Sequence, residues 1–477
     1  MTDYPVSSEP ESTILTESLP GFEPSMYEAL SHPVDIDAGH EPNLNIYRDG
    51  GDPVHSKYTY ESPFSGYLKG KDGKYWGDNK FEIAYTQRGN KGPLVLLLHG
   101  VPSNRYLYFP IQKRLSPFCR TIAIDMLGMG ESSKPRYYGE PKPYQSPTEI
   151  QKEKDYAGIN EPWDWVFDID YVDKLMNHLY PDEKFYFVAD DWGSGINSHY
   201  AAQFDQDRLL GFIQIDPIAF DGYPVSEIQA IGRASQIPVV SGEDGTDDAM
   251  FKMAMGAVDQ TMVQIFKTMV YDPNVWNQYL LRAIKHPYMD VDYDRSEFRD
   301  GEDASSLTLR LKWEALRVLA DRAAILAPAL LLPYDAEKNP KGVKFENITV
   351  PTLILWGDRD NMMPSQQVYR FKWSMKNAPV QITMIQNAGH FAGTDNPNYV
   401  SAAILDFIAR VSGKDKLADI FVGFDGIWKG DEKEMVKDLR AIYRVGEIPT
   451  LSENDIGMME NTGTYIGSPL QFSNIPQ

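Results

Sequence analysis

Short runs of consecutive apolar residues recur through the middle of the chain, separated by longer stretches with helical spacing. Six such runs lie at 94–98 (LVLLL), 121–125, 185–189, 210–215, 352–356 and 381–385. A short continuous apolar run is typical of a strand that is buried on both faces of a sheet. Between the second and third runs, residues 163–179 carry apolar side chains at helical spacing, with Pro162 near the start and Pro181 past the end. This alternation predicts an α/β fold with a mostly parallel, doubly wound sheet.

The alternation is interrupted by a long insertion at residues 217–347. Its pattern is mostly helical, and five of its methionines fall within twenty residues, at Met250, Met253, Met255, Met262 and Met269. The insertion begins at the carboxyl end of a predicted strand, which is the edge of the sheet where α/β proteins bind ligands. We therefore expect a helical lid over a core formed by residues 75–216 and 348–412.

Charge is concentrated at the two ends of the chain. The protein has 477 residues and a net charge of −22, to which residues 1–55 contribute −10 and residues 413–477 contribute −4. We expect residues 1–74 to be an acidic N-terminal arm and residues 413–477 a C-terminal extension with a helix near 431–444. The acidic balance argues against nucleic acid or an anionic membrane surface as a partner.

Composition excludes several further classes of protein. The single cysteine, Cys119, excludes a disulfide scaffold and a cysteine-based metal site. The N-terminus has neither the basic nor the apolar region of a secretory signal, and no apolar run approaches the length of a membrane span. We expect a soluble cytoplasmic protein, while its oligomeric state stays open.

A strand-to-helix turn carries the strongest chemical signal. Ala189-Asp190-Asp191-Trp192-Gly193-Ser194 follows a predicted strand and fits the nucleophile elbow of α/β hydrolases, with Asp191 at the nucleophile position. Asp190 fits worse, because Trp192 would then occupy a place that requires a small residue. In this fold the residue after the nucleophile, Trp192, supplies one backbone N–H of the oxyanion hole. The residue after His99-Gly100, which is Val101, supplies the other.

The order of the catalytic triad in this fold is nucleophile, acid, histidine. Of eight histidines only His390 follows the last predicted strand, so His390 is the candidate base. The acid should follow the strand at 352–356, where Asp360 is preferred because Asp358 suits turn formation beside Gly357. Asp216, which ends the preceding strand, is the alternative triad acid.

Four segments together resemble one branch of the α/β hydrolases. Residues 92–137, 185–195 (FYFVADDWGSG), 352–364 (TLILWGDRDNMMP) and 386–397 (QNAGHFAGTDNP) are similar to the epoxide hydrolases and haloalkane dehalogenases. The resemblance covers about residues 75–412 and is weak in the lid. It implies that Asp191 forms a covalent alkyl ester, that His390 activates water to hydrolyse it with Asp360 orienting the ring, and that no metal or organic cofactor is needed.

The resemblance leaves two substrate classes open. Haloalkane dehalogenases hold the halide with the tryptophan after the nucleophile and with a polar side chain after His-Gly, but here that position is Val101. Epoxide hydrolases accept an apolar residue there and use lid tyrosines to donate to the epoxide oxygen. The lid offers Tyr279, which is slightly preferred, and Tyr271, Tyr288, Tyr293 and Tyr334.

We therefore expect an epoxide hydrolase that acts on a small apolar organic substrate. The first alternative is a haloalkane dehalogenase. Further alternatives are a cofactor-free oxygenase of luciferase type, which keeps the Asp-Trp-Gly and His motifs, and a non-enzymatic ligand-binding member of the fold.

Overall fold

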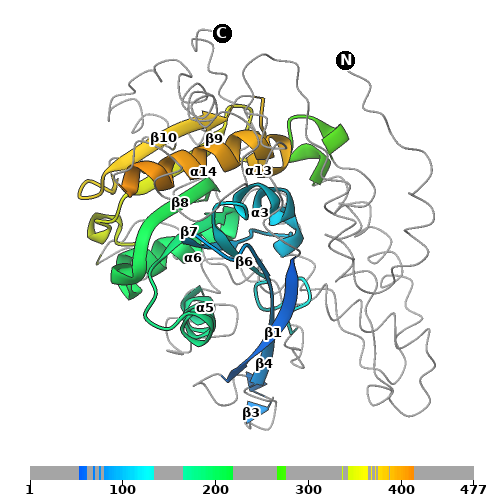
Figure 1. The fold of residues 1–477 in the computed structure, drawn as a ribbon, viewed down its shortest axis with the longest axis vertical. Helices are drawn as coiled ribbons and strands as arrows, with labels where there is room; N and C mark the ends of the chain where they lie inside the picture. Colours follow the sequence, from blue (N-terminus) through cyan, green and yellow to red (C-terminus); the bar gives the residue numbers. More distant parts are fainter. Residues whose placement is uncertain are drawn as a thin grey trace, which may run out of the picture.

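A computed structural model of the chain describes residues 53–61, 68–69, 75–76, 80–133, 165–218, 266–275, 342–363 and most of 374–412, together with the single residues 336, 367 and 371. An eight-stranded sheet forms its centre, in the order β1-β4-β6-β5-β7-β8-β9-β10 (Figure 1). The strands are β1 (Val54–Glu61), β4 (Lys80–Arg88), β5 (Leu94–Leu98), β6 (Arg120–Ile124), β7 (Phe185–Asp190), β8 (Leu209–Pro217), β9 (Thr352–Gly357) and β10 (Val380–Ile385). A separate two-stranded ribbon pairs β2 (Leu68–Lys69) with β3 (Tyr75–Trp76).

The six strands expected from apolar runs are confirmed, and they pair in parallel from β6 to β10. Two antiparallel strands, β1 and β4, were not predicted. β1 lies within residues 1–74, which the sequence assigned to the N-terminal arm, so the sheet begins earlier than the predicted core boundary at residue 75. Its residues are mostly exposed or half-buried, as suits an edge strand, and so they give little apolar signal.

Alternate residues of each central strand pack on opposite faces of the sheet. In β5, Leu94, Leu96 and Leu98 belong to one apolar cluster, and Val95 and Leu97 belong to the other. Helices α5 (Trp165–Leu179) and α6 (Asp191–His199) contribute to the first cluster, whereas α3 (Phe109–Leu115) and α14 (Pro397–Val411) contribute to the second. The sheet is therefore buried on both faces, which explains its uninterrupted apolar runs (Figure 1).

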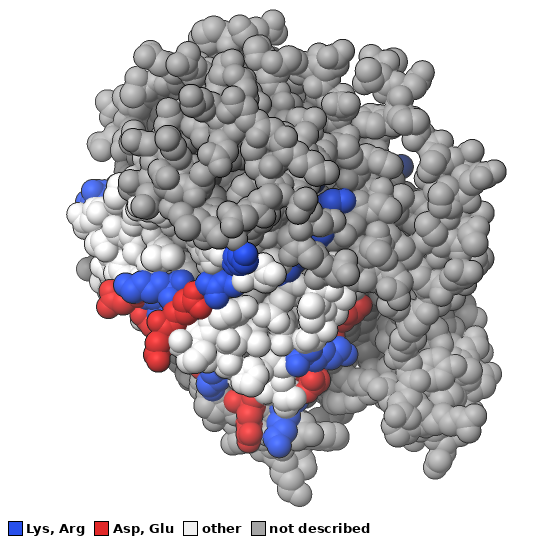
Figure 2. Space-filling view, in the orientation of Figure 1, with Lys and Arg blue, Asp and Glu red and all other residues white. Residues whose placement is uncertain are grey.

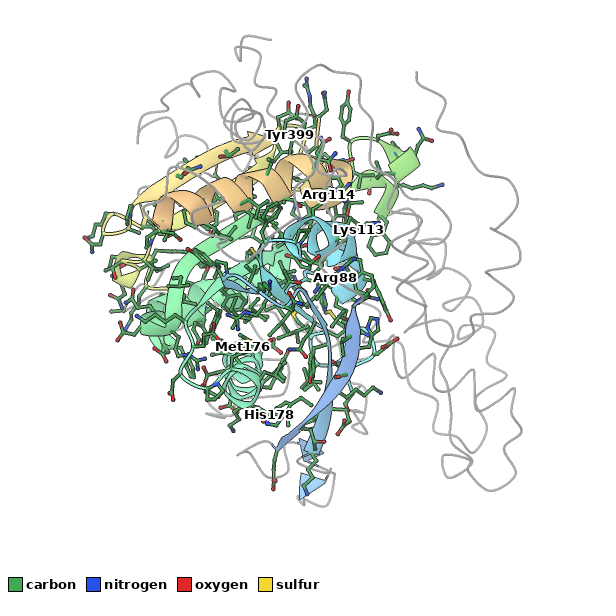
Figure 3. The ribbon with its side chains drawn as sticks, viewed as in Figure 1. Arg88, Lys113, Arg114, Met176, His178 and Tyr399 are labelled. Carbon is green, nitrogen blue, oxygen red and sulfur yellow. The ribbon has the colours of Figure 1, made fainter. Side chains whose placement is uncertain are left out.

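Buried polar contacts fix the helices that cover the second face. The Arg114 guanidinium on α3 donates to the Asn398 side chain on α14, and both residues are buried. Figure 3 shows Arg114 on α3 below Tyr399 on α14. This contact holds the start of α14 against α3.

Much of the predicted lid lies outside the described residues, as does the helix expected near 431–444. Of the insertion at 217–347, the structure describes its first two residues, the segment 266–275, residue 336 and its last six residues. On the described part of the face in Figure 2, basic and acidic side chains lie next to one another. Within the described residues, no helix is long and apolar enough to cross a membrane.

Candidate active site

The carboxyl ends of the parallel strands bring the predicted site residues to one edge of the sheet. Each lies in or directly after a strand end: Gly100 and Val101 after β5, Asp191 after β7, Asp216 in β8, Asp360 after β9 and His390 after β10. In open α/β sheets this edge is where ligands bind. The positions predicted along the chain therefore converge in space.

Asp191 occupies a strained turn between β7 and α6. Its φ is 44°, in the left-handed region that non-glycine residues rarely adopt. The turn depends on close packing, because a Cβ added at Gly193 would lie 2.3 Å from the Leu98 carbonyl oxygen. Ser194 stabilises the turn by donating from its hydroxyl to the Asp191 carbonyl, while the same hydroxyl accepts from Ile218 N–H at 3.1 Å.

The loop after β5 presents a backbone donor to the Asp191 carboxylate. Val101 N–H donates to Asp191 Oδ1 at 2.7 Å. His99 fixes this loop and does not touch the triad in the contacts described: Met126 N–H donates to its Nε2 at 3.0 Å, so its Nδ1 carries the proton and donates to the Gly100 carbonyl at 2.8 Å. Trp192 is fully buried in α6, and its backbone role in the oxyanion hole stays a prediction.

His390 lies between two carboxylates. Its Nδ1 is 2.9 Å from Asp360 Oδ2, and its Nε2 is 3.2 Å from Asp191 Oδ2. Burial lowers the pKa of His390, but the negative charges of Asp360 and Asp191 outweigh burial and hold the pKa well above its ordinary value. With both nitrogens facing carboxylates, the ring is an imidazolium when Asp191 is ionised.

Asp360 is held by three further donors. Trp356 Nε1–H donates to Oδ2 at 3.0 Å, and the N–H groups of Met362 and Met363 donate to Oδ1 at 2.8 and 2.9 Å. Asp358 instead accepts from Ala388 N–H at 3.4 Å, which fits the turn role expected for it. The sequence did not single out Trp356, although a tryptophan four residues before the acid was a visible signal.

Asp216, the alternative triad acid, contacts two backbone groups instead of the imidazole. Gly357 N–H donates to its Oδ1 at 2.7 Å, and Ala392 N–H donates to its Oδ2 at 3.0 Å. Burial first, and then the charge of Asp360, raise the pKa of Asp216 well above its ordinary value. Asp216 thus ties the loop carrying Asp360 to the loop carrying His390.

A short segment of the insertion docks on the histidine loop. Asp395 Oδ2 accepts from Tyr271 N–H at 2.9 Å and from Gly389 N–H at 2.7 Å. Phe391 N–H donates to the Met269 carbonyl at 3.0 Å. The side chain of Tyr271 is 50% exposed, and Tyr279 lies outside the described residues, so the identity of a lid acid stays a prediction.

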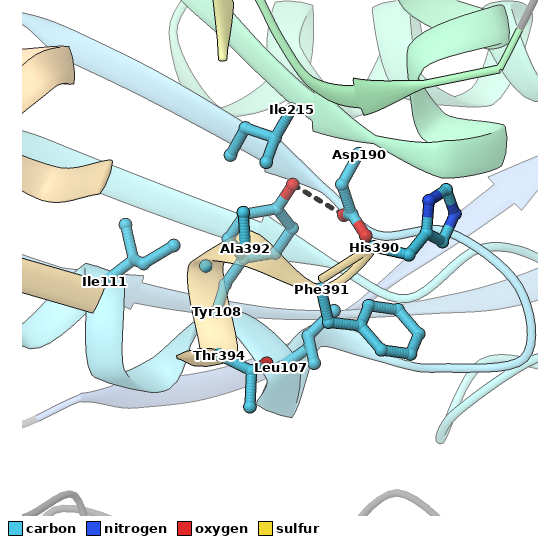
Figure 4. Close-up of a pocket in the computed structure, with 10 residues that line it drawn as sticks. Leu107, Tyr108, Ile111, Asp190, Ile215, His390, Phe391, Ala392 and Thr394 are labelled. Carbon is cyan, nitrogen blue, oxygen red and sulfur yellow. Dashed lines mark hydrogen bonds between the residues drawn. The ribbon is translucent and has the colours of Figure 1, made fainter. Parts of the chain in front are cut away.

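A small cavity adjoins the triad on the side of the second apolar cluster. It is about the size of one water molecule and is lined by Tyr108, Asp190, Ile215, His390 and Thr394, among others (Figure 4). Among the described residues, no group of three or more His, Cys, Asp and Glu side chains is arranged to hold a metal ion.

Comparisons with known proteins show what this chain is similar to. The family model described as the alpha/beta hydrolase fold matches residues 93–239. Epoxide hydrolase 3 of Xenopus tropicalis is 22% identical over 350 residues, which cover 72% of this chain and 77% of the relative. A haloalkane dehalogenase of Mesorhizobium japonicum is 30% identical over 129 residues, covering 27% of this chain and 33% of the relative. A solved ligand-free epoxide hydrolase superposes with a TM-score of 0.47 and 16% identity, over 75% of this chain and all of the other.

The sheet order, the elbow and the family match define an enzyme of the α/β-hydrolase superfamily. Within that superfamily, the chain is similar to relatives that are named epoxide hydrolase and haloalkane dehalogenase.

Proposed function

We propose that this enzyme is an epoxide hydrolase that works through a covalent ester on Asp191. The observation that supports this proposal most strongly is the continuous contact from Asp191 through His390 to Asp360. A carboxylate suits substitution at a saturated carbon, because the ester that forms keeps a carbonyl group that water can attack.

In the first half-reaction, Asp191 attacks one carbon of the epoxide ring. A bond forms between its oxygen and that carbon, the ring C–O bond breaks, and the ring oxygen takes a proton from a lid acid, for which Tyr279 and Tyr271 are the candidates. The product is a hydroxyalkyl ester. Esterification removes the charge of Asp191, which is one of the two charges that raise the pKa of His390. The imidazolium therefore becomes more acidic and passes its proton to the deprotonated lid acid, which restores that acid.

In the second half-reaction, neutral His390 removes a proton from water through Nε2, and the hydroxide attacks the ester carbonyl. The oxyanion forms where Val101 N–H already donates to Asp191, and Trp192 N–H is the proposed second donor. On collapse, the leaving alkoxide takes the proton from His390, and the diol departs. The proton released as Asp191 returns to a carboxylate passes to His390, which becomes the imidazolium of the resting enzyme again.

Haloalkane dehalogenation is the second candidate, because a curated relative of that name shares 30% identity over part of the chain. Val101 counts against it: an apolar side chain after Gly100 offers no donor to a departing halide. The proposed substrate is thus a small apolar epoxide, and the proposed reaction requires no cofactor.

A substrate panel separates these candidates. The purified enzyme is offered styrene-type epoxides and bromoalkanes, with diol formation followed by chromatography and halide release followed by a pH indicator. Diol without halide is expected. Halide release without diol would establish the dehalogenase, and oxygen uptake with an imidazopyrazinone would establish the oxygenase. If no substrate of any of these classes is turned over, a non-enzymatic ligand-binding protein is favoured.

A further inference from the structure

A second carboxyl group, that of Asp190, belongs to the residue just before the proposed nucleophile and has no part in the reaction described above. It is the last residue of β7, its side chain is buried, and it precedes α6 without capping that helix. Tyr108 O–H donates to its Oδ1 at 2.7 Å (Figure 4). Its Oδ2 is buried and has no hydrogen-bond partner among the described residues.

The surroundings of Asp190 disfavour a negative charge. The cavity beside it is lined by Leu107, Ile111 and Ile215, and the Thr394 hydroxyl there is also without a hydrogen-bond partner in the described structure. Asp191 next to it is a second carboxylate. The cation that acts on Asp190 is His390, whose nitrogens already face Asp191 and Asp360. Burying an ionised carboxylate costs much free energy when one of its oxygens accepts no hydrogen bond and its nearest cation is already paired with other carboxylates. Burying the neutral acid costs less.

We propose that Asp190 is a positioning residue that acts in its neutral, protonated form, so that its ionisation slows hydrolysis of the Asp191 ester. The catalytic part of this inference rests on the proposed function. The protonation part does not, because it concerns the free protein.

Electrostatics agree with this assignment. Burial raises the pKa of Asp190 to about 7, and the charge of Asp191 adds to this rise. The hydrogen bond from Tyr108, the charge of His390 and the backbone N–H of Gly100 oppose it. Among the described residues, Asp216 is a further titratable group near Asp190 and Tyr108, and its charge acts on Tyr108.

Ionised Asp190 would act on the second half-reaction in two ways. It would replace the negative charge that esterification of Asp191 removes, and so keep His390 protonated when the reaction needs a neutral base. It would also repel the oxyanion that forms on the neighbouring Asp191. Both effects reduce the rate as pH rises through the pKa of Asp190.

Asp190→Asn tests the proposal, because an amide has the shape of the neutral acid and cannot ionise. The matched control is Asp173→Asn: Asp173 Oδ1 also accepts from a buried tyrosine, Tyr200, at 2.9 Å, but Asp173 lies on α5 with Arg208 nearby. The measured quantity is the ratio of kcat for epoxide hydrolysis at pH 8 to that at pH 6. With a pKa of about 7, this ratio should be about tenfold higher in Asp190→Asn than in the wild type or Asp173→Asn.

A second measurement needs no substrate. Folded Asp190 holds its proton to a higher pH than the unfolded chain does, so the wild type should lose stability as pH rises from about 4 to about 7. The melting temperature of Asp190→Asn relative to the wild type should then rise by about 5 °C across that range. An unchanged difference between the two proteins, or an equal kcat ratio, would overturn the proposal. If the melting temperatures shift as expected but no epoxide is turned over, the proposed function is rejected, and the conclusion that Asp190 is protonated in the free protein stands.

Discussion

Replacement of Gly100 by alanine tests whether the loop after β5 positions the Asp191 carboxylate. A Cβ at Gly100 would lie 2.3 Å from Asp191 Cβ and 2.5 Å from its Oδ1. Carbon atoms in contact are normally about 3.5–4.0 Å apart, so the two groups must separate by about 1 Å. Asp191 is held by the start of α6, and its Oδ1 accepts from Val101 N–H. The displacement therefore moves the nucleophile relative to both His390 and the oxyanion donor.

A misplacement of about 1 Å at a reacting group costs about a hundredfold in rate, which corresponds to ~2.7 kcal/mol in the barrier. We expect Gly100→Ala to lower kcat for epoxide hydrolysis by about that factor. The control is Gly211→Ala in β8, where the added Cβ would lie 2.8 Å from a ring atom of Phe407, on the α14 face of the sheet. That variant should lose about 1–3 kcal/mol of stability by overpacking and keep its kcat. A Gly100→Ala enzyme with the kcat of the wild type would refute the reasoning.

Two further predictions concern the loops around His390. Asp360→Asn should lower kcat by about a thousandfold or more, because the amide no longer stabilises the imidazolium. The control in the same loop, Asp358→Asn, should lower kcat by less than about threefold. Comparable losses of kcat for the two variants in steady-state assays would contradict the assignment of Asp360 as the acid. Asp395→Ala should leave the N–H groups of Tyr271 and Gly389 without their shared acceptor, Oδ2, at a cost of about 1–3 kcal/mol. The exchange of these amide hydrogens should then accelerate about tenfold, and unchanged exchange would show that Asp395 does not hold the insertion.

The central strands, and the loops that bring Asp191, Asp360 and His390 together, could be predicted from sequence because each leaves a local mark. A strand buried on both faces, such as β5, is apolar at every position, and Asp191, Asp360 and His390 each follow such a strand. β1 lacks this mark, because an edge strand exposes many of its residues, and it was assigned to the arm.

Contacts between distant loops could not be read from sequence. Asp190 was considered only as a weaker nucleophile, because nothing in the chain indicates that Tyr108, 82 residues earlier, donates to it. The same holds for Asp216, whose two backbone partners come from the end of β9 and from the start of the short helix α13 (Ala392–Asp395). The position of Asp216 at a strand end was visible in the sequence. Whether its carboxylate accepts from a backbone N–H or from an imidazole depends on the packing of three segments.

The central claim is that Asp191 forms an ester that His390 hydrolyses. His390→Gln removes the base and leaves the nucleophile, so the ester should accumulate. After incubation with a styrene-type epoxide, intact mass spectrometry should show an increase equal to the mass of the epoxide, and peptide mapping should place it on Asp191. The double variant with Asp191→Asn serves as the control and should show no increase. Absence of the adduct in His390→Gln, or an adduct on another residue, would contradict the account.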